Sequence, residues 1–470
     1  MPQPMHDSLP PLSWQLQALI QEGWEQEVLS HLPATSEQQA RRLGAFVRAR
    51  GLSCVGDLLR GLLAYVLCAS SLRQLGAWAV LIGLANLSHV AWQKRLRRAR
   101  GWLLWLLSEL LAVAAPPPVV AQRRIVLIDA TRLKEPGGCG DDWRVHLGYD
   151  LLAGRLLDVK ISDRHTAEGF TLFDLRTGDV VVADRGYCRR GQLAYVLRSG
   201  AHLVVRLAVF QLPLLDERGQ PFDVLAWLKE RGSGHHSCLV AFEHEGGRFL
   251  GRLIACSLPE EAAERARAKE RKKANKKQRQ LKEETLYVCG WVLLFTSLAA
   301  NAWSDEQVLT LYRARWQIEL LIKRMKQLLK LAQLRGKTAL TNEATILALL
   351  LAWALLQPEV EQARHMLTEA AEHWALAHCQ ANSPEPPPAP SLPTVSSWTV
   401  TGLCVQTLRQ LVQGFWTFAR LQSCLPCLQR FLLSHRRQRQ HQESTIRRQL
   451  LAHLGPLTAS SSSLFFCSSA

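Results

Sequence analysis

The stretch between Tyr312 and Lys326 carries the side chains with the clearest chemical use. If it is helical, turning about 100° per residue, five of its ionisable groups lie within about 80° of arc on one face. They are Tyr312, Arg315, Glu319, Lys323 and Lys326. Most of the remaining circumference is apolar, which is typical of a buried helix. A polar stripe on a buried helix must line a site, because burying unpaired charge is costly. The commoner explanation of such charges is an exposed helix with pairs four residues apart, such as Glu319 with Lys323.

Two apolar runs further upstream each end in an aspartate, Asp129 after residues 124–128 and Asp184 after residues 179–183. Continuous apolar runs rich in β-branched residues indicate buried strands. If the two strands are parallel neighbours, both aspartates lie at the same edge of the sheet, where open α/β sheets bind ligands. One aspartate at a strand end is usually a turn residue, but two of them together with Glu319 predict a site.

Asp129, Asp184 and Glu319 would offer only hard oxygen ligands, which suit Mg²⁺ or Mn²⁺ and not zinc. Two such ions can activate a water or a 3′-hydroxyl and stabilise the leaving oxygen at phosphorus. Glu319 would be positioned by a long helix that Ser304 and Gln307 begin with a capping box and that Gly336 ends.

The spacing Tyr-x2-Arg-x3-Glu-x6-Lys resembles the Y-R-E-K signature of one group of bacterial DDE transposases, the fourth insertion-sequence family. The sequences Asp129-Ala-Thr and Asp184-Arg-Gly-Tyr resemble the two aspartate motifs of that group. The resemblance implies an α/β fold, a ribonuclease-H-like mixed sheet of five strands flanked by helices. It also implies a β-rich insertion between the second aspartate and the glutamate.

The resemblance further assigns roles to single residues. Asp129, Asp184 and Glu319 would be the catalytic metal ligands for two ions. Tyr312, Arg315 and Lys326 would contact DNA phosphates near the cleavage site. Apart from the resemblance, Lys323 is a weaker candidate for a DNA contact because it shares their face, and Arg185 is also expected to contact DNA.

Trp291 lies 21 positions before Tyr312, where better-studied members of the group carry a tryptophan that stacks on a flipped base. By that resemblance Trp291 would stack on DNA, a contact worth about 1–3 kcal/mol. The alternative is a core tryptophan on a strand, as most tryptophans are.

The chain is strongly basic, with 57 Lys and Arg against 40 Asp and Glu and a net charge of +17. This balance predicts a polyanionic partner, either nucleic acid or an acidic membrane surface. Ten of the basic residues fall between positions 265 and 282. Such runs are more often solvated loops, but this one is so one-sided that we favour a contact with DNA phosphates, on a helix that orders on DNA.

Targeting signals are not evident in the sequence. Residues 1–16 have no continuous apolar core, and the most apolar run, residues 344–356, is too short to cross a bilayer. We therefore expect a cytoplasmic, nucleoid-associated protein with no membrane partner. The 12 scattered cysteines predict no zinc site.

The expected organisation has six parts. Residues 1–118 form a helical DNA-binding region, with a plain helical bundle as the equally weighted alternative. The others are the first part of the core (119–209), the β-rich insertion (210–296), the second part of the core (297–380), a Pro-rich linker (381–395) and a helical C-terminal region with a disordered tail (396–470).

The resemblance implies a cut-and-paste transposase that binds its terminal inverted repeats and target DNA, as a homodimer in the DNA complex. Characterised members of the Y-R-E-K group release their element through a hairpin intermediate, and the resemblance implies the same step here. Two alternatives stay open: a catalytically inactive DNA-binding relative that represses transposition, and a nuclease of the same fold.

Overall fold

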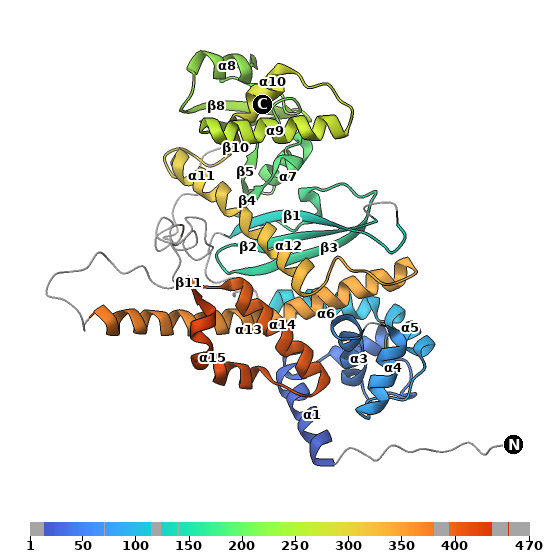
Figure 1. The fold of residues 1–470 in the computed structure, drawn as a ribbon. Helices are drawn as coiled ribbons and strands as arrows, with labels where there is room; N and C mark the ends of the chain where they lie inside the picture. Colours follow the sequence, from blue (N-terminus) through green and yellow to red (C-terminus); the bar gives the residue numbers. More distant parts are fainter. Residues whose placement is uncertain are drawn as a thin grey trace.

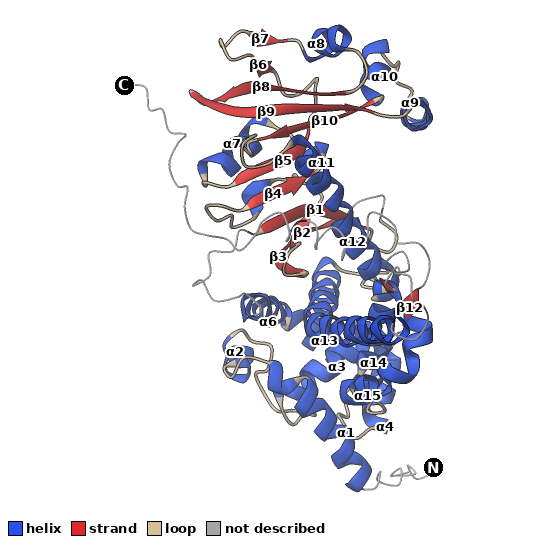
Figure 2. Ribbon diagram, turned by 90° about the vertical axis from the view of Figure 1, so that its left-hand side faces the viewer, coloured by secondary structure: helices blue, strands red, loops and turns tan. Residues whose placement is uncertain are grey.

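The computed structural model describes residues 14–69, 71–113, 124–138, 142–379, 394–434 and 450. A twisted ten-stranded mixed sheet occupies one half of the molecule and a body of packed helices the other (Figures 1 and 2). This arrangement agrees with the α/β, ribonuclease-H-like fold expected from the sequence.

The strand order in the large sheet is β3-β2-β1-β4-β5-β10-β9-β8-β6-β7. The strands are β1 (Ile125–Leu133), β2 (Trp143–Asp150), β3 (Arg155–Asp163), β4 (Val180–Ala183), β5 (His202–Arg206), β6 (Leu214–Leu215), β7 (Pro221–Phe222), β8 (His235–His244), β9 (Gly247–Ser257) and β10 (Trp291–Thr296). A separate two-stranded sheet joins β11 (Thr394–Val395) to β12 (Leu433–Ser434).

The first five strands form the core predicted from the sequence. β2 and β3 make the expected antiparallel hairpin, whose turn is fixed by the Asp150 side chain and by Gly154 at a φ of 72°. β1, β4 and β5 run parallel to one another. The insertion is not a separate sheet, because β10 pairs with β5 and thereby continues the core sheet into β9 and β8.

Helices make up the helical body and also flank the sheet (Figures 1 and 2). They are α1 (Trp14–Glu27), α2 (Ser36–Arg42), α3 (Val55–Leu67), α4 (Leu72–Leu81), α5 (His89–Arg98), α6 (Arg100–Val113), α7 (Arg190–Arg198), α8 (Val224–Arg231), α9 (Glu260–Lys276), α10 (Glu283–Cys289), α11 (Asp305–Ala314), α12 (Trp316–Leu328), α13 (Ala339–Cys379), α14 (Ser397–Gln413) and α15 (Phe418–Leu432), with short 3₁₀ turns η1 (Leu29–His31), η2 (Phe170–Leu172) and η3 (Arg185–Tyr187).

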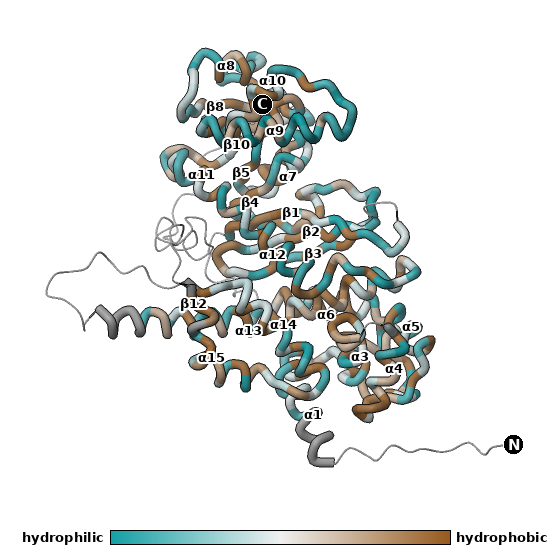
Figure 3. The backbone as a smooth tube through the Cα atoms, viewed as in Figure 1, coloured by the Kyte–Doolittle hydropathy of each residue, from teal (hydrophilic) through white to brown (hydrophobic). Residues whose placement is uncertain are grey.

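Helix α13 is the axis of the helical body and is mostly apolar (Figure 3). By length and composition, residues Ala339–His373 could cross a membrane, but 78% of the apolar window is buried inside the protein. It packs against α3, α5, α6, α14 and α15. We therefore interpret it as a core helix.

The N-terminal helices share one apolar core with α13 and α14. Some of the basic side chains at the end of α5 and the start of α6 are engaged within the protein: Arg97 donates to the Thr341 hydroxyl at 3.0 Å, and Arg100 pairs with Glu343 at 2.5 Å. Lys94 and Arg98 are exposed. DNA binding by this region, and the six-part division of the chain, stay predictions. Most of the expected linker and the basic and polar end of the chain lie outside the described residues.

Candidate active site

The register of the parallel strands brings the two aspartates together. Leu127, Val182 and Val204 are paired across β1, β4 and β5 and lie in the core on the same face of the sheet. Side chains of a strand alternate between its faces. Two residues further along each strand, Asp129, Asp184 and Arg206 therefore form the next row on that face.

The position of Asp129 differs from the prediction that it ends its strand. β1 continues to Leu133, because its residues 126–133 pair with β2 along their length. Asp129 thus lies inside a strand and is held by it. Asp184 does follow the last residue of β4, as predicted, and its Oδ1 accepts the Gly186 amide at 2.7 Å.

The glutamate is carried by a pair of helices and not by the single long helix predicted. Ser304 and Gln307 form the expected capping box. The helix is interrupted at Arg315, whose amide bonds to the Tyr312 carbonyl three residues back. α12 then ends at Leu328, followed by Lys330 at a φ of 63°, so Gly336 does not end it. α11 packs on β4 and β5, and α12 packs on β1.

Arg315 joins the glutamate to the first aspartate. Its guanidinium lies 2.6 Å from Glu319 Oε1 and 3.8 Å from Asp129 Oδ2. The same group lies 5.7 Å from the centre of the Tyr312 ring. The polar stripe predicted for this stretch is therefore grouped over the sheet face that carries the aspartates, despite the break between α11 and α12.

The Asp129 carboxyl lies in a shielded, acidic environment. Burial raises its pKa to about 6, and the nearby Asp184 and Glu319 carboxylates add to the rise. The Ala130 amide, which donates to Asp129 Oδ1 at 2.8 Å, and Arg315 act in the opposite direction. Electrostatic repulsion of the Asp129 carboxylate by both Asp184 and Glu319 supports the view that the three groups lie near one another.

Two further charged residues near this site were not singled out in the sequence. Arg206 occupies the corresponding position on β5, and burial lowers its pKa, with Arg185 and Arg315 adding to the fall. The signal for it was present, because Arg206 is the one charged residue within the apolar run 203–210. Glu168 pairs with Arg144 at 3.5 Å, and its carboxylate approaches the Asp184 turn at Gly186. No periodic pattern marks Glu168.

The other candidate residues are arranged around the same helices. The Lys326 ammonium donates to the Arg132 carbonyl of β1 at 3.2 Å. Lys323 is exposed, and its ammonium lies 5.8 Å from the centre of the Trp398 ring on α14. Arg185 is exposed in the turn after Asp184.

Trp291 is the candidate that the structure places in the core. It begins β10, is 5% exposed, and has the rings of His236 and Tyr287 at 6.2 and 6.4 Å. This environment is the one expected for a packing tryptophan. Base stacking stays a prediction, and it requires the ring to leave this packing.

We expect Trp291→Ala to lower the free energy of unfolding by about 3–5 kcal/mol, because it removes a buried aromatic side chain. Trp291→Phe should cost less, since the ring fills more of the space. Urea unfolding of the two variants measures this. A loss below about 1 kcal/mol for the alanine variant would show that the ring is not packed in solution.

The three carboxyl groups of the site are candidate ligands for a metal ion. Asp129, Asp184 and Glu319 supply carboxylate oxygens, which suit a hard divalent cation. Over the described ranges, however, no three His, Cys, Asp or Glu side chains lie close enough together to hold an ion, and the Arg315 guanidinium contacts both Glu319 and Asp129. The residues fit a metal chemically, provided that Arg315 moves.

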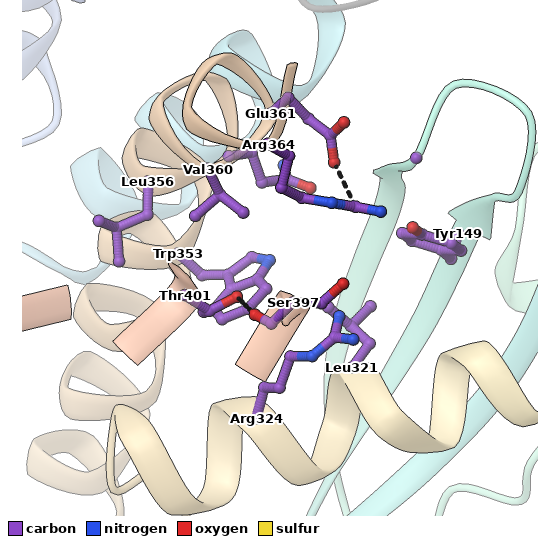
Figure 4. Close-up of a pocket in the computed structure, with 12 residues that line it drawn as sticks. Tyr149, Leu321, Arg324, Trp353, Leu356, Val360, Glu361, Arg364, Ser397 and Thr401 are labelled. Carbon is purple, nitrogen blue, oxygen red and sulfur yellow. Dashed lines mark hydrogen bonds and ion pairs between the residues drawn. The ribbon is translucent and has the colours of Figure 1, made fainter. Parts of the chain in front are cut away.

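A small cavity on the other side of α12 is a poor candidate for the site. Residues Leu321 and Arg324 of α12, Glu361 and Arg364 of α13 and Thr401 of α14 line it (Figure 4). Its volume is about 30 Å³, enough for about one or two water molecules. Arg364 is also paired with Glu361 at 2.9 Å. We interpret this cavity as a packing defect between helices.

Comparison with known proteins gives consistent results. Residues 121–355 match the family described as "Transposase DDE domain". Transposase InsL for insertion sequence element IS186A of Escherichia coli is 36% identical over 344 residues, covering 71% of this chain and 93% of that protein. The transposase for insertion sequence element IS421 of Escherichia coli is 36% identical over 345 residues, with the same coverage. The matched range contains Asp129, Asp184 and Glu319.

Proposed function

The chain belongs to the DDE transposases of insertion sequences, and on that premise we propose that it cuts DNA at the ends of its element and joins the freed 3′-hydroxyls to target DNA. The observation that carries the proposal is the position of Arg315, 2.6 Å from Glu319 and 3.8 Å from Asp129. This contact holds the glutamate helix over the sheet row that contains both aspartates.

Asp129, Asp184 and Glu319 would hold two divalent ions, Mg²⁺ or Mn²⁺. Bound there, the ions would lower the pKa of the attacking hydroxyl and offset negative charge at phosphorus. Arg315 would first have to release the two carboxylates. A DNA phosphate is the anion best suited to take the guanidinium in exchange, since arginine binds phosphate and carboxylate in the same forked geometry. DNA binding would thereby open the metal site.

The surrounding residues would position the DNA backbone. Tyr312 of α11, Arg315 between the two helices and Lys326 of α12 would contact phosphates along the edge of the site. Arg185, which is exposed and follows Asp184, would contact the same backbone. Lys323, on the same face of α12, is exposed and would be a further contact. Such contacts fix the register of a duplex without reading its sequence.

Finer features follow from the resemblance to the Y-R-E-K group. They are a hairpin intermediate at the element's end, a flipped base on Trp291, a homodimer in the DNA complex and a cytoplasmic, nucleoid-associated protein.

A strand-transfer assay with pre-cut ends tests the proposal. The duplex carries the terminal inverted repeat found beside the gene and ends in a 3′-hydroxyl, and supercoiled plasmid is the target. We expect joined products in the presence of Mg²⁺ or Mn²⁺. Hydrolysis without joining would indicate a nuclease, and binding with neither reaction would indicate a repressor.

Arg206 provides a second test of the site. Arg206→Ala should lower end cleavage by about 10–100-fold, because it would remove a charged hydrogen bond to a phosphate, worth about 1.5–3 kcal/mol. Arg206→Lys should recover part of the activity. The control is Arg198→Ala on α7, which removes an exposed ion pair with Glu245. Full activity of Arg206→Ala would remove this residue from the site.

A further inference from the structure

Helix α9 of the insertion is anchored by one face. Its Ala263 and Ala274 are each 2% exposed and lie eleven residues apart, which places them on the same side of the helix. That side faces the start of β10, where a side chain at Gly290 would come within 3.7 Å of Ala263. The helix is fully formed from Glu260 to Lys276, so the expectation that it orders only on DNA is not needed.

The opposite face of α9 carries a line of cations. At about 100° per residue, its members fall within about 60° of arc, and their centre points away from the two buried alanines. All four are exposed. The members of this group, called the α9 stripe below, are Arg265, Lys269, Lys272 and Lys276.

Three of the four carboxylates of α9 pair with cations outside the stripe. Arg267 pairs with Glu260 and Glu264, both at 2.7 Å. Arg271 lies 3.6 Å from Glu264, and Lys273 lies 3.6 Å from Glu270.

Within the stripe, only Arg265 has an ion pair among the described residues. Its partner Glu261 lies 3.7 Å away, and the two side chains are 74% and 90% exposed. So exposed a pair holds its partners weakly. The stripe therefore presents nearly four uncompensated positive charges to solvent.

The position of the stripe relates it to the active site. In Figure 2, α9 lies on the same, right-hand side of the sheet as α11 and α12. Figure 3 shows α9 as one of the most hydrophilic segments of this part of the chain. From Arg265 to Lys276 the stripe extends about 16 Å along the helix axis.

We infer that the α9 stripe binds the phosphate backbone of a DNA duplex that extends beyond the active site. This inference rests on the proposed function and names a second contact for the same DNA. A narrow line of mobile cations suits a row of phosphates and carries no base specificity. An acidic membrane is the less suitable partner, because the apolar side of α9 is buried in the protein and has nothing to insert.

Salt-dependent DNA binding by the full chain tests the inference. The variant Lys269→Gln/Lys272→Gln removes two stripe charges. The control Arg271→Gln/Lys273→Gln removes two charges from the same helix that are already paired with carboxylates. Dissociation constants are measured between 50 and 200 mM salt on a duplex with the element's end and on a random duplex of equal length, and thermal melting checks both folds.

The stripe variant should weaken binding to both duplexes alike and reduce the slope of log K against log salt by about 2, or roughly 1 per lysine. The control should keep the wild-type slope. The inference would be overturned if the stripe variant and the control had the same slope, whether or not that slope differs from the wild-type value. It would also be overturned if the stripe variant bound both duplexes like the wild type and lost binding only to anionic lipid vesicles, tested in parallel. In those cases metal-dependent cleavage by the wild-type protein would still stand. Absence of wild-type DNA binding and cleavage would instead overturn the proposed function.

Discussion

Asp184→Asn and Glu319→Gln should each reduce end cleavage by at least about 10³-fold while leaving binding to the end duplex nearly unchanged. Each substitution removes an anionic oxygen ligand from a site whose metal ions are expected to supply several kcal/mol of transition-state stabilisation. Neither side chain is part of the apolar core. Single-turnover cleavage and a binding titration, both in Mg²⁺, measure the two effects.

Two exposed acids serve as matched controls for this prediction. Asp174→Asn changes a carboxylate in the loop before β4, and Glu306→Gln changes one in the first turn of α11. Both variants should cleave like the wild type. If Asp184→Asn still cuts at a comparable rate, the assignment of the metal ligands is wrong. Loss of binding together with cleavage would point to a damaged fold instead.

The local parts of the site were predictable because each depends on nearby residues. The apolar run before Asp184 predicted β4, and the spacing from Tyr312 to Glu319 predicted their shared face. The capping box at Ser304 predicted the start of α11. These signals depend on helix or strand periodicity and on short-range hydrogen bonds, which a sequence carries directly.

The remaining features depend on contacts between distant segments. The sequence around Arg315 is compatible with one continuous helix, and α11 and α12 pack on different strands, which only the assembled sheet determines. Pairing with β2 extends β1 past Asp129. Likewise, the pairing of β10 with β5 merges the insertion with the core sheet. Glu168 reaches the site from a loop with no periodic pattern.

Asp129→Asn should stabilise the metal-free protein by about 1–3 kcal/mol at pH 7.5, although it abolishes cleavage. Burial raises the pKa of Asp129 to about 6, above the value of about 3.9 in an unfolded chain. Between these values the folded state keeps a proton that the unfolded state has released. Wild-type stability should therefore fall as the pH rises from about 4 to 6 and then level off. The asparagine variant should lack this fall.

Asp179 is the control for the claim that ionisation of buried Asp129 lowers the stability of the protein. Asp179 is also buried, but Arg124 donates to its Oδ1 at 2.8 Å, so Asp179→Asn should destabilise the protein by about 3 kcal/mol. Urea unfolding at pH 4.5 and 7.5 compares the variants.

Mg²⁺ should stabilise the wild type and have less effect on Asp129→Asn, because a ligand that binds only the folded state adds to its stability. If Asp129→Asn were the less stable protein at pH 7.5, the Asp129 carboxylate would be a structural group, and the case for a metal site built around it would fail.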